Sequence, residues 1–350
     1  VSGLCFLPPP FAPHVLLCAR HVFFVFFFWG LLLDSVLFYG AVFGWRVYQG
    51  AFFVQWERGE RESELLYCKD WHFAKEHKGY GAYEVPIHFR EDWLNDFYDA
   101  RADLGDDYRF CYMGRKGTWT PLHRDVLRSY SWSSNVMGRK LWIMYPPQEE
   151  GKLRDGLGNL VWNVEGDVDE AAYPLFQEAK CVRVVQEEGE TLFVPSGWWH
   201  QVVNLEDCIS INHNWVNSCG LHHSTTQILE DHGDVVRSIK DSCGKAEDFP
   251  VVCEELLMAH AGINLRGLFS FLKLVGEAQV AAAESALQAL AEASVPAENR
   301  QGDLLWCAFR LAQVGHALLR LFALPHVAWL FERSLLDEQS DGSPGAAEKE

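Results

Sequence analysis

The segment Gly117–Pro147, GTWTPLHRDVLRSYSWSSNVMGRKLWIMYPP, contains a His-Arg-Asp tripeptide at residues 123–125. Protein kinases use this tripeptide in their catalytic loop, but they also need a glycine-rich phosphate loop, a strand lysine in V-A-I-K and an asparagine five residues after the aspartate. Position 130 is Tyr, and no G-x-G-x-x-G sequence precedes the tripeptide. The kinase interpretation is therefore excluded.

A metal site is the second interpretation of the same tripeptide. If residues 123–125 lie on a β-strand, His123 and Asp125 point to the same face, because side chains alternate along a strand. A second histidine, His200, follows a Pro-Ser-Gly turn in LFVPSGWWHQVVNL. Two histidines and one carboxylate bind Fe(II) on one side and leave positions open for a chelating cosubstrate and O2. We therefore predict that His123, Asp125 and His200 bind Fe(II).

Polar residues in register with this site suit an acidic cosubstrate such as 2-oxoglutarate. In GRKLWIMYPP, alternation places Lys140 on the same face as Trp142 and Met144. Burying a lysine among bulky apolar residues costs free energy unless its ammonium group meets an anion. Thr120, three residues before His123, offers a hydroxyl group, and Asn212 in CISINHNW offers an amide.

Hydrophobic patterning predicts the elements that position these residues. Short β-type segments follow one another from residue 108 to residue 216 and are separated by Gly and Pro, which is typical of a barrel or sandwich. Apolar residues at helical spacing predict a helix over 90–100, and Ala- and Leu-rich stretches predict helices beyond Cys219. The expected fold class is therefore mainly β with helical additions.

The composition divides the chain into four parts. We expect an atypical apolar segment over residues 1–56, a catalytic domain over 57–218, a helical region over 219–335 and a disordered tail over 336–350. The first segment contains Asp34, whose carboxylate is costly inside a membrane span. We interpret this segment as a gene-model artefact, with a membrane anchor as the alternative.

Charge and cysteine content limit the partners and the compartment. The formal net charge of -18 argues against a nucleic-acid partner and suits a basic protein substrate. Ten cysteines occur without a C-x-x-C pair, so we expect buried reduced thiols rather than a zinc ribbon. The chain has no N-x-Ser/Thr acceptor. We expect a cytoplasmic protein, with the nucleus as the alternative, and no membrane partner unless residues 1–56 are genuine.

Together these motifs resemble the jumonji-C (JmjC) family of Fe(II)/2-oxoglutarate oxygenases, whose fold is a double-stranded β-helix. The resemblance is carried by HRD, GRKLW before YPP, FVPSGWWHQVVNL and SINHNW. More narrowly, YCKDWHF, DDYRFCYMG, SWSSNVMGRK and SINHNWVN resemble a branch that hydroxylates a lysine of the eukaryotic translation release factor. The similarity covers the chain from Leu66 to Leu274 and leaves out the N-terminal apolar segment.

The resemblance implies a jelly-roll or cupin-like JmjC barrel followed by an α-helical C-terminal region. It also implies that Lys140 meets the C5 carboxylate of 2-oxoglutarate. Thr120 and Tyr67 fall where relatives place further hydroxyl contacts with this cosubstrate, and Asn212 stands where many relatives have Ser or Thr. The implied iron ligands are the three residues predicted above, His123, Asp125 and His200.

Three function classes follow from the resemblance. The first is a protein hydroxylase that uses Fe(II), 2-oxoglutarate and O2 to hydroxylate C4 of a release-factor lysine and so promote translation termination. The second is an N-methyl-lysine or N-methyl-arginine demethylase, which uses the same metal site. The third is a catalytically silent binding module, against which the intact triad argues. The resemblance favours the first class, with the release factor as the protein partner that it implies.

Overall fold

The computed structural model describes residues 52, 53, 56, 65–244, 248–291, 297–324 and 327. These residues form two compact units. One unit contains the described residues up to Arg90 together with Asp107–Asp125 and Tyr130–Asn214, and the other contains Glu91–Asp106, Val126–Ser129 and the described residues from Trp215 onward. The predicted tail over 336–350, and residues 1–56 apart from positions 52, 53 and 56, lie outside the described residues. The division into domains at 57–218 and 219–335 stays a prediction.

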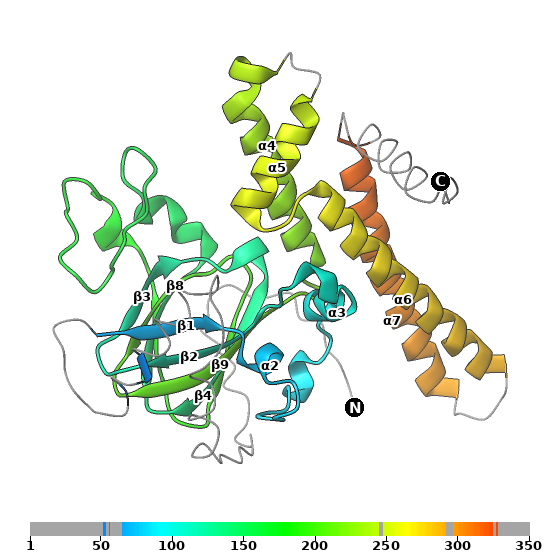
Figure 1. Cartoon of the computed structure of the whole chain (residues 1–350), viewed down its shortest axis with the longest axis horizontal. Helices are drawn as coiled ribbons and strands as arrows, with labels where there is room; N and C mark the ends of the chain where they lie inside the picture. The colour runs from blue at the N-terminus through cyan, green and yellow to red at the C-terminus, as the bar shows by residue number, and fades with distance from the viewer. Residues whose placement is uncertain are drawn as a thin grey trace, which may run out of the picture. The chain divides into compact units, whose positions relative to one another are not determined.

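Among the described residues, nine strands form two antiparallel sheets in a jelly-roll-like arrangement (Figure 1). The five-stranded sheet has the order β1 (Tyr67–Trp71), β2 (Arg109–Gly114), β9 (Cys208–Trp215), β4 (Tyr130–Met137) and β7 (Thr191–Val194). The four-stranded sheet has the order β3 (Trp119–His123), β8 (Trp199–Asn204), β5 (Lys140–Tyr145) and β6 (Val182–Gln186). The β-type segments expected between residues 108 and 216 are therefore strands.

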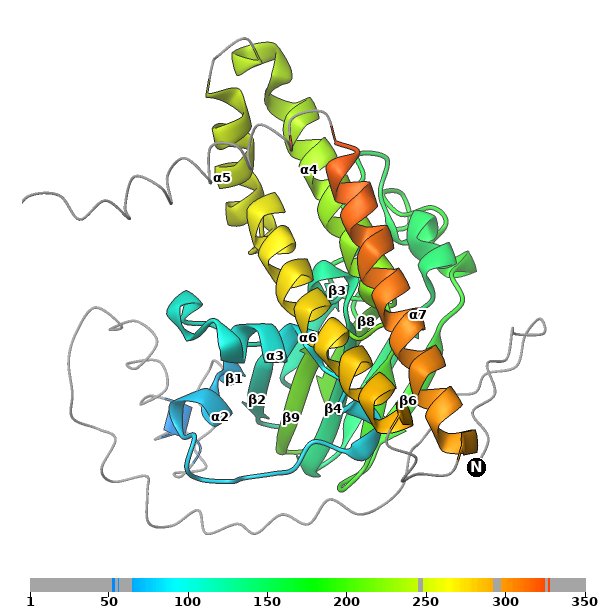
Figure 2. The same ribbon diagram turned by 90° about the vertical axis from the view of Figure 1, so that its right-hand side faces the viewer.

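Helices make up more of the chain than the sequence indicated. The second unit contains α3 (Trp93–Ala100), α4 (Leu221–Cys243), α5 (Phe249–Ala261), α6 (Leu265–Ala291) and α7 (Ala297–Phe322). The last two have 27 and 26 residues and lie side by side (Figure 2), whereas the strands have between four and eight residues. The expectation of a mainly β protein is therefore wrong, because the C-terminal helices are long and the strands are short.

The first unit also contains short helical elements. They include α2 (Phe73–Glu76), which follows β1, and the 3-10 helix η5 (Pro147–Leu153), which follows β5. No helix among the described residues is both long enough and apolar enough to cross a bilayer. The alternative of a membrane anchor concerned residues 1–56 and falls almost entirely on residues that the structure does not describe.

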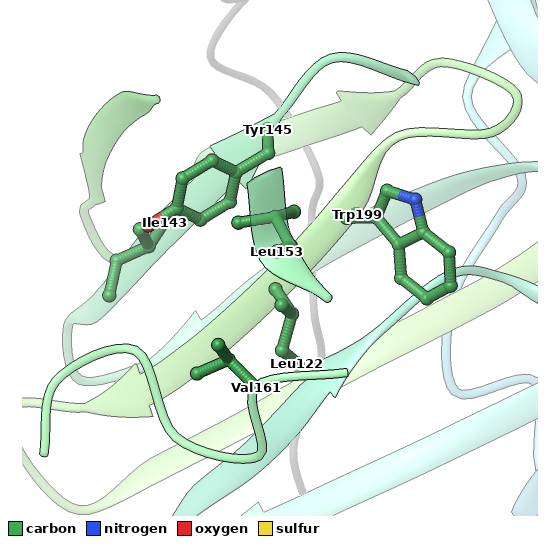
Figure 3. Packing of buried hydrophobic residues seen from close by; sticks show 6 residues of the cluster. All are labelled: Leu122, Ile143, Tyr145, Leu153, Val161 and Trp199. Atoms are coloured by element: carbon green, nitrogen blue, oxygen red, sulfur yellow. The ribbon is translucent and has the colours of Figure 1, made fainter. Parts of the chain in front are cut away.

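The two faces of β5 pack into different hydrophobic clusters, as the alternation of side chains along a strand predicts. Trp142 and Met144 pack with Leu192 and Val194 of the opposite sheet, so this face points between the sheets. The other face of β5 belongs to a second cluster, shown in Figure 3, in which η5 and the following loop cover the outside of the four-stranded sheet. The members of this outer cluster are Leu122, Ile143, Tyr145, Leu153, Val161 and Trp199.

The turn between β4 and β5 requires a glycine. Gly138 has a φ of 78°, and a Cβ atom there would collide with the backbone oxygen of Asp207. We expect Gly138→Ala to lower the free energy of unfolding by about 2 kcal/mol or more, because the left-handed strain adds to the collision. Gly189 has the same φ of 78° with nothing within 4 Å of the added atom. Urea unfolding of Gly189→Ala therefore isolates the strain, and equal losses in both variants would contradict the collision.

The cysteines agree in part with expectation. Among the described residues, the cysteines with placed side chains are all free thiols. Most are buried, but Cys181 and Cys219 are exposed, so the expectation of buried thiols is wrong for these two. Cys181 precedes β6 directly and Cys219 precedes α4, where the chain connects two elements at the surface.

Candidate functional site

The structure brings the three predicted metal ligands together. His123 is the last residue of β3 and pairs directly with His200 of β8, so the two imidazole rings lie 4.3 Å apart between centroids. One nitrogen from each histidine and one carboxylate oxygen of Asp125 all lie within 4.8 Å of one another. The three candidate ligands therefore come from β8, from the end of β3 and from the segment that directly follows β3.

Asp125 reaches this point from outside the sheet. The strand β3 ends at His123, and the 3-10 helix η4 (Val126–Arg128) follows Asp125 with Leu127 at a φ of 56° and Arg128 at 46°. The expectation that His123 and Asp125 share a strand is therefore wrong, because the chain turns away through two left-handed residues. The expectation that their side chains meet is confirmed.

Backbone carbonyl groups fix the orientation of both imidazole rings. The Nδ1 atom of His123 lies 2.8 Å from the oxygen of Pro121, and the Nδ1 atom of His200 lies 3.2 Å from the oxygen of Trp198. A proton on each Nδ1 completes these hydrogen bonds and leaves the lone pair of each Nε2 available for a metal ion. The two rings are thus held in the tautomer that a metal site requires.

The electrostatics of the site favour the neutral form of the second histidine. His200 is 3% exposed, and burial together with the nearby His123 ring lowers its pKa to about 4. Neutral imidazole is the form that binds metal ions, and near pH 7 no proton has to leave His200 before a metal ion binds. The site therefore suits a divalent cation, which the Asp125 carboxylate would partly neutralise.

Ser131 on β4 supports the carboxylate ligand. Its hydroxyl group donates a 2.7 Å hydrogen bond to Oδ2 of Asp125. Ser131 is 8% exposed, so water does not easily replace this bond. Ser131 was not predicted from the sequence, although the serines of SWSSN are a signal, since a strand that faces only an apolar core has little use for hydroxyl groups.

We expect Ser131→Ala to weaken metal binding about tenfold, because groups that orient a metal ligand are typically worth 10- to 100-fold in affinity. Calorimetric titration of the metal-free chain with Mn(II) measures this change. Ser134→Ala is a matched control on the same strand, since it also removes a buried hydroxyl with a 2.6 Å partner, Thr191. Equal dissociation constants for the two variants would show that the contact with Asp125 is dispensable.

Lys140 places a buried ammonium group inside the barrel. It is 2% exposed and lies on the interior face of β5 with Trp142 and Met144, and its Nζ atom donates a 2.6 Å hydrogen bond to Oγ of Ser210. Burial lowers the pKa of Lys140 to about 8, so the ammonium form still predominates at neutral pH. Within the described ranges, no carboxylate pairs with this ammonium group. A buried cation of this kind fits the carboxylate of a small ligand.

Tyr67 and Thr120 lie on strands that border this interior. Tyr67 begins β1 and contacts Asn204, which lies directly opposite Lys140 in the pairing of β5 with β8. Burial raises the pKa of Tyr67, so its phenol remains a neutral hydrogen-bond donor. The Thr120 hydroxyl accepts a 3.1 Å hydrogen bond from the backbone N–H of Val202, which leaves its own proton free to donate.

Asn212 shares its face of β9 with Ser210, two residues earlier. Its Oδ1 atom is buried and has no hydrogen-bond partner among the residues that the structure describes. A buried amide oxygen without a partner is costly, and a bound ligand or water molecule would satisfy it. The lysine, however, contacts Ser210 rather than Asn212. The sequence motifs assigned no role to Ser210.

These features test whether an iron ion and 2-oxoglutarate fit the chain. The two oriented imidazoles and the carboxylate match the ligand set of a two-histidine, one-carboxylate metal site. The buried ammonium group of Lys140 and the unsatisfied amide oxygen of Asn212 match a polar anionic ligand. The residues present therefore fit both groups.

Comparison with known proteins agrees with this geometry. Residues 110–215 match the family described as JmjC domain, hydroxylase. The chain is 43% identical over 235 residues to 2-oxoglutarate and iron-dependent oxygenase JMJD4 of Gallus gallus, covering 66% of this chain and 55% of that protein. It is 39% identical over 264 residues to JMJD4 of Homo sapiens, covering 74% and 61%.

A relative with a different printed activity is equally similar. The Arginine-specific demethylase JMJ20 of Arabidopsis thaliana is 43% identical over 236 residues, covering 63% of this chain and 51% of that protein. The chain thus spans about half to three fifths of the length of these curated relatives. The matched segment contains all three candidate metal ligands, Lys140, Thr120 and Asn212. Residues 110–215 are therefore a JmjC domain.

Proposed function

We propose that this chain is an Fe(II)- and 2-oxoglutarate-dependent oxygenase. The observation that carries the proposal is the meeting of His123, Asp125 and His200 in one JmjC barrel that also buries Lys140 without an ion-pair partner among the described residues. The printed names of the JMJD4 relatives, which state dependence on iron and 2-oxoglutarate, support the same activity.

The chain's own residues would hold and orient the reactants. His123 and His200 present Nε2, Asp125 presents the carboxylate oxygen that Ser131 leaves free, and Lys140 fixes the far carboxylate of the cosubstrate. When bound, iron and 2-oxoglutarate supply an oxidation in which O2 hydroxylates a C–H bond while 2-oxoglutarate becomes succinate and CO2. The interior core beside Lys140 excludes water from the cosubstrate.

The more specific proposal is a protein lysyl hydroxylase. Its substrate would be a lysine of the eukaryotic translation release factor, hydroxylated at C4, which would make the enzyme a promoter of translation termination in the cytoplasm, with the nucleus as the alternative. Its support is the likeness of YCKDWHF, SWSSNVMGRK and SINHNWVN to that branch of the family. The net charge of -18 suits a basic target.

Arginine demethylation is the second candidate. The relative JMJ20, whose printed name states this activity, matches the chain at 43% identity. Both reactions use the same metal site and differ in the carbon that is hydroxylated, because hydroxylation of an N-methyl group releases formaldehyde. The substrate rather than the triad therefore separates the two candidates.

Mass spectrometry of substrates after incubation with the full chain, Fe(II), ascorbate and 2-oxoglutarate tests these proposals. Recombinant release factor and an N-methyl-arginine peptide are the two substrates, and His123→Ala is the control. A lysine that gains one oxygen, absent in the control, supports hydroxylation, whereas a peptide that loses a methylene supports demethylation. Turnover of 2-oxoglutarate with neither product keeps the oxygenase and rejects both substrates. Absence of iron binding and of turnover leaves the silent binding module.

A further inference from the structure

A cluster of charged and aromatic side chains lies directly behind the metal ligands. Arg124 stands between His123 and Asp125, and Trp199 immediately precedes His200. Trp199 belongs to the outer cluster of the four-stranded sheet, and Arg124, which directly follows the end of β3, contacts it there. The guanidinium carbon of Arg124 lies 4.9 Å from the centre of the Trp199 ring. One side-chain contact therefore joins the two ligand-bearing segments from behind.

Glu150 on η5 extends this contact into a network. Its carboxylate accepts a 3.2 Å hydrogen bond from Nε1 of Trp199 and lies 3.7 Å from a guanidinium nitrogen of Arg124. It also pairs with Arg154 at 2.7 Å, and the Arg154 guanidinium lies 5.4 Å from the Trp199 ring centre. We call Arg124, Glu150, Arg154 and Trp199 the Trp199 clamp.

The clamp keeps its charges at neutral pH. Burial favours the neutral form of Glu150, but hydrogen bonds from Arg154 and Trp199 and the charge of both arginines outweigh it and lower its pKa. Trp199 is 7% exposed, so its contacts with the guanidinium groups are partly shielded from water. Shielded contacts between a planar guanidinium and an indole are stronger than surface ion pairs.

The strand ladder alone does not hold this corner of the site. The pairing of β3 with β8 is irregular between Thr120 and His123, and β3 ends at His123. Arg124 and Asp125 therefore lie beyond the regular backbone hydrogen bonds of the sheet. Ser131 holds the carboxylate of Asp125, and the contacts with Trp199 and Glu150 hold Arg124, the residue before it.

We propose that Arg124 is a positioning residue, which acts through Glu150 and Trp199 to keep the ligand-bearing ends of β3 and β8 in register for the metal ion. This inference rests on the proposed metal site and adds a function for the middle residue of the His-Arg-Asp tripeptide. None of the four clamp residues is one of the candidate metal ligands. The effect of the clamp is expected in metal affinity more than in the folding of the metal-free chain.

Arg124→Gln tests the proposal in the full, metal-free chain. We expect its dissociation constant for Mn(II), measured by calorimetry, to rise by about 10- to 100-fold, as for other groups that orient metal ligands. Arg124→Lys should lie between this variant and the wild type, because lysine keeps the charge near Glu150 but loses the planar stacking. The melting temperature of the metal-free chain is the second readout.

Arg183→Gln is the matched control, because it also breaks an arginine–glutamate pair, with Glu165 at 2.7 Å, in the same unit. The proposal predicts that both glutamine variants melt at similar temperatures and that only Arg124→Gln loses metal affinity. Equal dissociation constants for Mn(II) in Arg124→Gln and Arg183→Gln would overturn the proposal. If Arg124→Gln does not fold, Glu150→Gln provides the same comparison, with loss of metal affinity supporting the proposal and wild-type affinity overturning it.

A double-mutant cycle addresses the path of the effect. If Arg124 acts through Glu150, the variant with both residues changed to glutamine should bind Mn(II) with less loss than the product of the two single losses. Independent, multiplicative losses would overturn the network. If the wild-type chain binds no metal, the proposed function itself is overturned. If the wild type binds Mn(II) and the Arg124 variant binds it equally well, only the role of Arg124 is overturned.

Discussion

Replacing His200 with alanine is expected to raise the dissociation constant for Mn(II) by more than about 100-fold, since even groups that only support a metal ligand are worth 10- to 100-fold. The imidazole is 3% exposed and is oriented by the Trp198 carbonyl, so no water or neighbouring side chain can readily replace its Nε2. Conversion of 2-oxoglutarate to succinate with Fe(II) should fall by at least the same factor. Calorimetry and succinate measurement check the two effects.

His213→Asn is the matched control for this loss. His213 is 1% exposed and lies on β9, but its Nε2 contacts the Tyr83 hydroxyl at 2.6 Å and its ring packs on Trp132. The control should therefore lose stability and keep metal binding. A His200→Ala chain that still binds one Mn(II) with wild-type affinity would contradict the assignment of the ligands.

Lys140→Met is expected to act in opposite directions on ligand binding and on stability. Without the ammonium group, the dissociation constant for 2-oxoglutarate should rise by more than about 100-fold, since leaving a buried carboxylate without its cation is strongly unfavourable. The metal-free variant should nevertheless be more stable than the wild type. The pKa of Lys140 falls from 10.5 to about 8 on burial, which corresponds to about 3 kcal/mol of destabilisation at neutral pH.

The pH dependence of stability follows from the same shift. Between pH 8 and 10.5 the unfolded chain binds the Lys140 proton and the folded chain releases it, so this residue makes the free energy of unfolding rise with pH across that window. Below pH 8 both states are protonated and the cost is constant. Lys140→Met should lack this rise, which urea unfolding at several pH values would measure. The same slope in both chains would contradict a charged Lys140 in the interior.

Binding of 2-oxoglutarate should weaken as the pH rises above 8, because the folded chain then loses the ammonium proton that the carboxylate needs. Lys152→Met serves as a control for the binding measurements. Lys152 is a partly exposed lysine paired with Glu149 at 2.8 Å, so its loss should not change the affinity for 2-oxoglutarate.

Alternation of side chains along a strand is a local rule that can be applied to a sequence. It placed Trp142 and Met144 on one face of β5, as the cluster between the two sheets confirms. It placed Asp125 on a strand because no local signal marks the left-handed turn at Leu127, where a residue with a Cβ atom is unexpected.

Contacts between segments that lie far apart along the chain could not be predicted from the sequence. The pairing of Lys140 with Ser210 joins residues 70 positions apart, and the contact of Trp199 with Glu150 joins residues 49 positions apart. Both depend on sheet register, which bulges such as the one between Thr120 and His123 alter. The helical share of the chain was underestimated for a related reason. Periodicity predicts that helices occur but does not define where they end. The helices α6 and α7 extend beyond the Ala- and Leu-rich stretches.

The most direct test of the oxygenase account is an anaerobic calorimetric titration of the metal-free chain with 2-oxoglutarate, in the presence and absence of Mn(II). If the triad and Lys140 hold the two ends of one ligand, 2-oxoglutarate should bind at least about tenfold more tightly when the metal is present, and the metal should gain the same factor from 2-oxoglutarate. His200→Ala should remove this coupling. An affinity for 2-oxoglutarate that does not depend on the metal would contradict the account.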